Sequence, residues 1–409
     1  MLTKLLINAA SNYPHKPAIV SVKNTISYAE LLASSISFAD YLSTKGVKKT
    51  VAVAVLLPNS PEFVTCTFAI ARMGAIMVPI NTQYREEELK FYLQDSAASV
   101  IVTTPELEPL CKKVVDQLGT PLQILTEVKL VSNGDGILQT TTDDNYIPIE
   151  SEGLYQYSTG STGTPKRVTR TQRQLKNEAD NFHQTVETTD DDRILAVAPF
   201  FHAHGFGNCI LAAVRVGATL VIIESFGRRK QVITTLIEEK ITIFPGVPFM
   251  FSILADAPSI STKKLTHLRL AFSAGAPLNK DTLDSFSEKF GADIKQLYGS
   301  TETGSICINI GSIDGDQWQS VGKPMHNVQV RIVKESGEDA QINEQGEIVI
   351  KSNAMTTGYA NLPEATKTSF IDGEFWSGDL GKKDSYGNIY ITGRKKLFIN
   401  AAGNKVDPG

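Results

Sequence analysis

Cysteine is scarce in this sequence, and the cysteines present are far apart. There are four of them, Cys66, Cys111, Cys209 and Cys307, and no two are separated by only two residues. Disulfide frameworks and structural zinc sites use closely spaced cysteines, so neither is indicated. We therefore expect four reduced, buried thiols and a cytoplasmic protein.

Long apolar runs and long basic runs are also missing. The longest clean apolar stretch, residues 51–57, is far shorter than the roughly 20 residues that span a bilayer. The N-terminus has no basic segment followed by an apolar one, which argues against a signal peptide. With a net charge of −4, the chain does not carry the positive surface typical of nucleic-acid binding. We expect no membrane span and no nucleic-acid partner.

The residues that are present predict a folded α/β protein. Hydrophobic residues make up 42% and charged residues 21% of the chain, which excludes a disordered or fibrous protein. In the first half, short apolar segments such as residues 51–57 and 75–79 alternate with helical patterns. One of these helices opens on the capping box formed by Ser27 and Glu30. This alternation favours a parallel sheet covered on both faces.

The pattern changes along the chain and predicts four parts. A polar connection over residues 130–150 precedes a second α/β run that begins near residue 193, and antiparallel signals follow residue 315. We expect two sheet-plus-helix subdomains and a β-rich, barrel-like subdomain. The expected boundaries are 1–192, 193–312 and 313–395, with 396–409 as a hinge and the start of a further domain.

The strongest chemical signal is the segment YQYSTGSTGTPK at residues 155–166. Glycines allow backbone N–H groups to face an anion, hydroxyls bind phosphate or magnesium, and Lys166 adds a positive charge. Proline before the lysine excludes a Walker A loop. The alternative is a flexible linker. The residues expected to bind phosphate are Ser158, Thr159, Gly160, Ser161, Thr162 and Gly163, with Ser158 also a candidate magnesium ligand.

This segment resembles the phosphate-binding signature of the adenylate-forming superfamily, which includes acyl-CoA synthetases, adenylation domains of peptide synthetases and firefly luciferase. One departure is Arg167, where glycine usually follows the lysine. Further segments that resemble the superfamily follow in the expected order over essentially the whole chain. The resemblance implies the fold of the large N-terminal domain of that superfamily.

The segment YGSTE at residues 298–302 resembles the second signature. The resemblance implies that Tyr298 stacks on adenine, Thr301 bonds the α-phosphate and Glu302 binds magnesium, which needs few carboxylates when phosphate oxygens complete its shell. The segment SAGAPL at 273–278 resembles the adenine-pocket loop and contributes Gly275 and Ala276. Read singly, these segments are also ordinary turns.

Two later segments complete the expected nucleotide site. In WSGDLG, Asp379 would accept hydrogen bonds from the ribose hydroxyls. In GRKK, Arg394 would contact the ribose or phosphate, and Lys396 falls at the hinge about which the superfamily's small C-terminal domain swings. The alternative interpretations are that Asp379 is an ordinary aspartate in a turn and that the GRKK segment is a solvated basic run. The adenylation lysine of that small domain has no counterpart here, and we expect a truncated rather than a naturally lidless chain.

The segment PFFHAHG at residues 199–205 resembles the gate at the carboxylate end of the acyl pocket. His202 occupies the histidine position of the superfamily, whereas His204 reads as a satisfied core group. Amino-acid-activating domains carry an aspartate here to pair the substrate's ammonium, but Phe200 and Phe201 offer no charge. The charge runs at 190–192 and 228–230 are interpreted as solvated.

Together these segments predict an acid–thiol ligase that uses ATP and Mg²⁺. A carboxylic acid, a fatty acid or another acid without an α-amino group, would form acyl-AMP and pyrophosphate, and the acyl group would pass to CoA or to the phosphopantetheine of an acyl carrier protein. The expected catalytic residues are Lys166, His202, Thr301 and Glu302. Open alternatives are aryl- or amino-acid adenylation, luciferase-like oxidation of the adenylate, and a lidless nucleotide- or acyl-binding protein.

Overall fold

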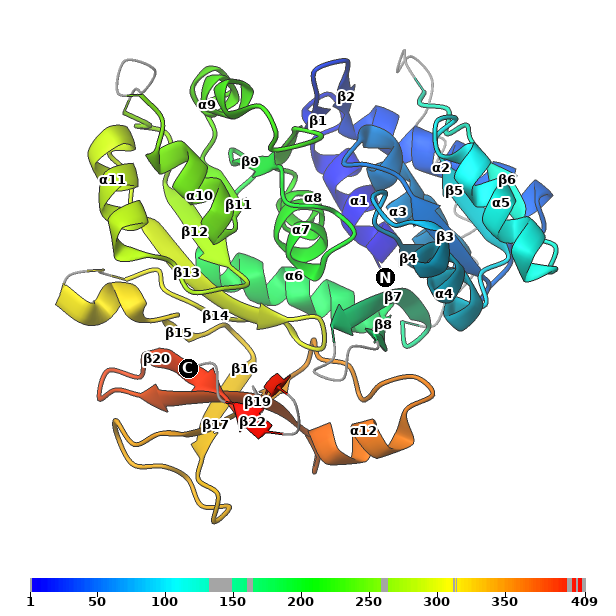
Figure 1. The fold of residues 1–409 in the computed structure, drawn as a ribbon. Helices are drawn as coiled ribbons and strands as arrows, with labels where there is room; N and C mark the ends of the chain where they lie inside the picture. The colour runs from blue at the N-terminus through cyan, green and yellow to red at the C-terminus, as the bar shows by residue number, and fades with distance from the viewer. Residues whose placement is uncertain are drawn as a thin grey trace.

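A computed structural model describes residues 2–131, 149–159, 165–258, 264–311, 313, 315–395, 399–401 and 404–406. Two large, mostly parallel sheets with helices stand side by side, and a smaller antiparallel sheet lies beneath them (Figure 1). This arrangement confirms the predicted α/β class with a β-rich third part.

The first large sheet has six strands in the order β6-β5-β3-β4-β7-β8. All neighbours run parallel except the hairpin formed by β7 and β8. Its strands are β3 (Ala52–Leu56), β4 (Ile76–Pro79), β5 (Val100–Thr103), β6 (Gln123–Leu125), β7 (Glu152–Thr159) and β8 (Pro165–Thr171). The helices of this part are α2 (Tyr28–Thr44), α3 (Pro61–Met73), α4 (Glu86–Ser96) and α5 (Glu108–Leu118).

Local chemistry sets the ends of these helices, and the start of α2 is as the sequence predicts. The Ser27 side chain accepts from the Glu30 backbone and Glu30 reaches back to Ser27, which forms the expected capping box of α2. Helix α3 has Pro61 in its first turn and ends at Gly74, whose φ of +64° is the left-handed conformation that glycine adopts at little cost.

The second large sheet has nine strands in the order β15-β14-β13-β12-β11-β9-β10-β1-β2. Its strands are β1 (Pro17–Val20), β2 (Thr25–Ser27), β9 (Arg193–Ala196), β10 (Thr219–Ile222), β11 (Ile243–Gly246), β12 (Leu270–Ala274), β13 (Ile294–Ser300), β14 (Gly304–Ile308) and β15 (Lys323–Pro324). Strand β1 pairs in parallel with β10, so residues 17–27 complete a sheet built mainly from residues after 192.

The helices of this second part are α1 (Leu2–Asn12), α6 (Gln172–Val186), α7 (Ala203–Gly205), the π-helix η1 (Phe206–Leu211), α8 (Ala212–Val216), α9 (Arg229–Glu238), α10 (Pro248–Ala255) and α11 (Lys280–Phe290). Helix α6 runs across the molecule beside both large sheets (Figure 1). One continuous apolar core joins α1, α2, α3 and α6 and extends into the β-rich part, so the three parts share their packing.

The β-rich part pairs β16 (Val328–Val333), β17 (Gly346–Ser352), β18 (Phe370–Ile371), β19 (Glu374–Lys383) and β20 (Ile389–Arg394) in antiparallel fashion. It also holds the short 3₁₀ helix η3 (Gly315–Gln319) and α12 (Pro363–Ser369). A separate hairpin joins β21 (Ile399–Ala401) and β22 (Asn404–Val406). The antiparallel pairing after residue 315 confirms the sequence prediction.

Two expectations about side chains have opposite outcomes. All four cysteines are buried and free, as predicted. The interpretation of residues 190–192 as solvated charges is wrong for Asp192, which is 3% exposed. Its carboxylate accepts from Arg269 at 2.8 Å and from the Thr242 hydroxyl at 2.7 Å. A charge directly before a buried strand is carried into the interior, where it needs such partners.

Candidate functional site

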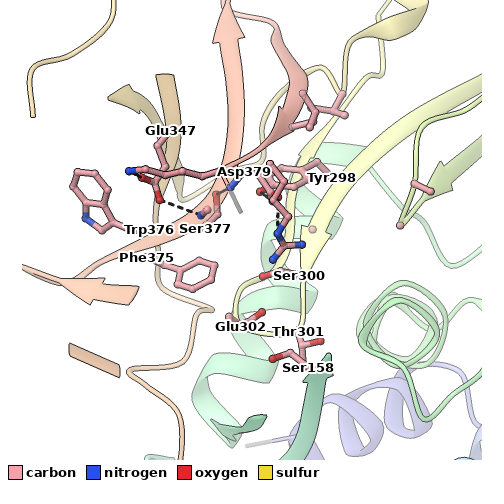
Figure 2. A pocket seen from close by; sticks show the side chains of 18 of the residues that line it. Ser158, Tyr298, Ser300, Thr301, Glu302, Glu347, Phe375, Trp376, Ser377 and Asp379 are labelled. Atoms are coloured by element: carbon pink, nitrogen blue, oxygen red, sulfur yellow. Dashed lines mark hydrogen bonds and ion pairs between the residues drawn. The ribbon is translucent and has the colours of Figure 1, made fainter. Parts of the chain in front are cut away.

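A cavity of about 1170 Å³ opens where the β13–β14 hairpin, the β7–β8 hairpin and the β-rich sheet meet. Segments far apart in the sequence contribute to its wall, as Figure 2 shows for Ser158, Thr301, Glu302, Tyr298 and Asp379. The wall contains most of the sequence-predicted binding residues: Ser158, Lys166, Gly275, Ala276, Tyr298, Thr301, Glu302, Asp379 and Arg394.

Some predicted positions do not join this wall. Residues 160–163 and Lys396 lie outside the described residues, and only the backbone of Thr159 is described, at the end of β7. His202 is described but does not line the cavity. The gate segment nevertheless adjoins the strand that carries Ser158, because the Gln156 side chain donates to the Phe201 carbonyl at 3.2 Å.

The ribose-binding candidates form a connected group on two paired strands. Asp379 on β19 and Arg394 on β20 are cross-strand neighbours, and Arg394 Nε lies 3.6 Å from Asp379 Oδ1. The Tyr298 hydroxyl, delivered by β13, donates to Asp379 Oδ2 at 2.6 Å. These contacts fix the carboxylate while it faces the cavity, which suits a hydrogen-bond acceptor for a polyhydroxylated ligand.

Burial changes the acid–base properties of this group. Burial is the main cause of the raised pKa of the Asp379 carboxyl. The charges of Glu302 and Glu347 raise this pKa further, whereas the Tyr298 hydroxyl and Arg394 lower it. Burial, with the neighbouring Asp379 charge, also raises the pKa of Tyr298 well above its ordinary value. Tyr298 therefore stays protonated and remains a hydrogen-bond donor.

A second carboxylate supports the irregular part of strand β19 that carries Asp379. Glu347 on β17 accepts from the Gly378 backbone N–H at 3.1 Å and from Lys395 Nζ at 2.9 Å. The Lys395 backbone N–H donates to the Gly378 carbonyl at 2.7 Å. Gly378 has a φ of +75°, which a residue with a side chain rarely adopts. Glu347 and Lys395 thus hold Gly378 through both its N–H and its carbonyl.

The part of the cavity wall around Tyr359 carries one carboxylate and one ammonium. The Tyr359 hydroxyl donates to Glu302 Oε1 at 2.8 Å, and Lys166 Nζ lies 4.7 Å from the centre of the Tyr359 ring. The Thr356 backbone N–H donates to the Glu302 carbonyl at 2.8 Å. Tyr359 therefore holds the two groups that the sequence assigns to phosphate and magnesium at a common aromatic ring.

Glu302, Ser158 and Thr301 fit a magnesium ion that is held mainly by the phosphates of a nucleotide. Among the residues that the structure describes, no group of three or more His, Cys, Asp or Glu side chains could hold a metal by itself. Glu302 and the hydroxyls of Ser158 and Thr301 supply oxygen ligands on the cavity wall, and Glu302 is 7% exposed. Mg²⁺ commonly uses one or two carboxylates together with substrate phosphates, so this donor set suits it.

The two histidines of the predicted gate have different surroundings. His202 precedes the short helix α7, keeps solvent access, and has a pKa lowered by desolvation. His204 Nε2 lies 3.1 Å from the Gly246 carbonyl, and its Nδ1 lies 3.0 Å from the Asn208 amide nitrogen. Asn208 in turn accepts from Ser305 at 2.9 Å. His204 is therefore a satisfied packing group, as the sequence indicates.

Some lining residues were missed by the sequence reasoning. Tyr359, Glu347, Gln296 and the two tryptophans, Trp318 and Trp376, all line the cavity. The available signals were weak: Tyr359 follows a glycine in a loop, and Glu347 follows the glycine that starts a strand. Nothing local shows that these side chains meet residues 166 and 379, because that depends on how the strands pair.

Comparison with known proteins identifies the family of this chain. The profile of the AMP-binding enzyme family matches residues 6–360. The chain belongs to the AMP-binding enzyme family. An oxalate–CoA ligase of Arabidopsis thaliana is 31% identical over 427 residues, which covers 100% of this chain and 81% of the relative. A long-chain-fatty-acid–CoA ligase of Mycobacterium tuberculosis is 28% identical, with 94% of this chain and 76% of the relative covered.

Solved structures of family members share the whole fold. ATP-bound MatB from Rhodopseudomonas palustris superposes with a TM-score of 0.84 at 26% identity, over 100% of this chain and 82% of that one. The N-terminal domain of FACL13 from Mycobacterium tuberculosis gives a TM-score of 0.85 at 26% identity, over 96% of this chain and 99% of the domain. The described chain is thus similar over nearly its full length to a domain solved alone.

Family membership confirms the predicted class of reaction. The chain is an ATP-dependent acid–thiol ligase of the adenylate-forming type. In this reaction a carboxylic acid is activated to acyl-AMP, and its acyl group is then transferred to CoA. Among the described residues of this AMP-binding enzyme, no helix is both long enough and apolar enough to cross a membrane.

Proposed function

We propose that the cavity binds ATP with its ribose at Asp379 and its phosphates toward Lys166, Thr301 and Glu302. The observation that carries this proposal is the convergence of these side chains, from three different sheets, on one cavity of about 1170 Å³. In this arrangement Gly275 and Ala276 lie against the base, because small residues let the backbone approach a flat ring. Tyr298 closes the pocket beside Asp379.

The first half-reaction needs alignment and charge stabilisation more than proton transfer. A carboxylate substrate is already ionised at neutral pH and can attack the α-phosphate without a general base. Thr301 and Lys166 would orient the phosphates and stabilise negative charge that develops there. A magnesium ion at Glu302 would supply further positive charge to the phosphates. Tyr359 keeps Glu302 and Lys166 in place for this role.

We propose an acid without an α-amino group as the substrate, with CoA as acceptor and an acyl carrier protein as the alternative acceptor. In the gate segment, Phe200 is 1% exposed, and neither it nor Phe201 can pair a substrate ammonium. An unpaired buried ammonium is costly, so amino acids would be rejected. His202 would contact the acid from the gate, since it precedes helix α7 with its side chain open to solvent.

The test is a thermal-shift screen of this chain with ATP and Mg²⁺ against paired acids. Each α-amino acid is matched with its des-amino analogue, and a fatty acid and an aryl acid complete the panel. We expect nucleotide-dependent stabilisation by acids without the amino group. Stabilisation by an amino acid but not by its des-amino analogue would favour the amino-acid adenylation alternative. No stabilisation by ATP itself would refute the proposed nucleotide site.

A further inference from the structure

The strand pair β7–β8 is fastened to helix α4 by three side chains, near the end of the pair where Thr159 faces Pro165. Tyr157 on β7 and Arg167 on β8 are cross-strand neighbours, and both reach Asp95 near the end of α4. The Tyr157 hydroxyl donates to Asp95 Oδ2 at 2.8 Å. Arg167 Nη1 lies 3.4 Å from the same oxygen and also donates to the Asp95 backbone carbonyl.

The next pair along the hairpin is part of the functional cavity. Ser158 and Lys166 are the next cross-strand pair, between the Tyr157–Arg167 and Thr159–Pro165 pairs, and both line the cavity wall. Because successive side chains on a strand point to opposite faces, one pair can face α4 while the next faces the cavity. Any rotation of the Tyr157–Arg167 pair would therefore move the Ser158–Lys166 pair as well.

The contact is packed within the protein rather than held in open solvent. The Arg167 side chain is 11% exposed, and its guanidinium lies 4.7 Å from the centre of the Tyr155 ring. The Tyr157 ring packs edge-on against Tyr92 of α4, with 4.6 Å between ring centres. Partial burial weakens screening by water and salt, so this ion pair is stronger than an exposed one.

The backbone of Arg167 extends the same contact toward the phosphate end of the cavity. Its carbonyl accepts from the Ala360 N–H at 3.0 Å, and Val168 forms an antiparallel bridge with Tyr359. Tyr359 is the residue whose ring lies beside Lys166 and whose hydroxyl bonds Glu302. Arg167 thus connects helix α4, through Asp95, to the segment that carries Tyr359, the residue beside Lys166.

We propose that Asp95, Tyr157 and Arg167 are positioning residues that set the placement of Ser158 and Lys166 toward the phosphates of ATP. This inference rests on the proposed nucleotide site. Arg167 stands where glycine usually follows the lysine in the superfamily, so in this chain the side chain adds an anchor that glycine does not provide. In the proposed site the ribose lies at Asp379, which the Tyr298 hydroxyl holds from a separate strand. AMP has the same ribose as ATP and lacks only the β- and γ-phosphates, so the anchor should matter for ATP more than for AMP.

The experiment compares ATP and AMP affinity by calorimetry in the wild type and in Arg167→Gly, Arg167→Lys and Asp95→Asn. Arg167→Gly and Asp95→Asn should weaken ATP by about tenfold, the equivalent of one hydrogen bond to a charged group, and leave AMP affinity unchanged. Arg167→Lys keeps the charge and should recover part of the loss. The matched control is Glu86→Gln, which removes an exposed ion pair to Lys113 at the other end of α4 and should change neither affinity.

The outcomes separate this inference from the proposed function. Equal losses of ATP and AMP affinity, or no loss for Arg167→Gly, would overturn the positioning role while leaving the nucleotide site intact. A wild-type protein that binds neither nucleotide would overturn the proposed site and this inference together. Melting temperatures of each variant, measured in parallel, identify any loss that comes from unfolding.

Discussion

Tyr298 and Asp379 stand 81 residues apart in the chain, yet the Tyr298 hydroxyl donates a 2.6 Å hydrogen bond to the Asp379 carboxylate. The bond joins β13 of the nine-stranded sheet to β19 of the β-rich sheet across the cavity wall. A hydrogen bond to an ionised acceptor is stronger than a neutral one and has a narrower geometry. The pair therefore fixes how the two sheets face each other at the cavity wall.

The first prediction concerns this pair and nucleotide affinity. Asp379→Ala removes the charged acceptor for the ribose and should raise the dissociation constants of ATP and AMP by about tenfold to a hundredfold. Tyr298→Phe keeps the ring and removes only the hydroxyl, so it should cause a smaller loss. Calorimetry checks both variants. Glu338→Gln, in an exposed turn, serves as the control, and unchanged AMP affinity in Asp379→Ala would contradict the assignment.

The second prediction concerns stability and pH at Asp379. Because burial raises the pKa of this carboxyl in the folded protein, its ionised form is held less favourably in the folded than in the unfolded chain. The folded protein holds the proton of this carboxyl more tightly than the unfolded chain does. This proton therefore stabilises the fold at low pH, and the stabilisation is lost as the pH rises through the pKa of the folded protein. Asp379→Asn should therefore raise the melting temperature at pH 7, with a difference that shrinks as the pH approaches 4. A lower melting temperature for the variant at pH 7 would contradict this.

The third prediction concerns His204, whose pKa is lowered to about 4, chiefly by burial. In the unfolded chain the His204 ring takes up a proton near the ordinary histidine pKa of about 6.5, whereas in the folded protein it takes one up only near pH 4. Stability should fall as pH drops from about 6.5 to 4, by at most about 1.4 kcal/mol for each pH unit. His204→Asn should flatten this part of the profile in denaturant titrations, whereas the exposed His267→Asn should not. An unchanged slope in His204→Asn would assign the effect to another group.

The fourth prediction uses the two tryptophans of the sequence as reporters. Trp318 and Trp376 both line the cavity, and Lys280 Nζ lies 5.9 Å from the Trp318 ring. Saturating ATP should change the intrinsic fluorescence of the protein, since a ligand in the cavity alters the surroundings of both indoles. Trp318→Phe and Trp376→Phe divide the signal between them. A nucleotide that binds by calorimetry without any fluorescence change would show that it binds outside this cavity.

The sequence alone predicted the parts that depend on local chemistry. The capping box at Ser27 and Glu30 follows from side chains and backbone within one turn of chain. The segment that carries Lys166 was identified from its glycines and hydroxyls directly after a strand, and those that carry Tyr298 and Asp379 from their resemblance to the adenylate-forming superfamily. The membership of the family confirms what these segments predicted about the reaction.

Only the tertiary structure decided which of these segments meet and which charges are buried. Residues 17–27 join the second sheet through β10, and Asp192 is carried into the interior beside Arg269. Tyr359 links Lys166 to Glu302, and Asp95 holds Arg167, although nothing near these residues in the sequence indicates their partners. Helix and strand patterns depend on neighbours a few residues away, whereas burial and long-range pairing depend on the surface that packs against each side chain.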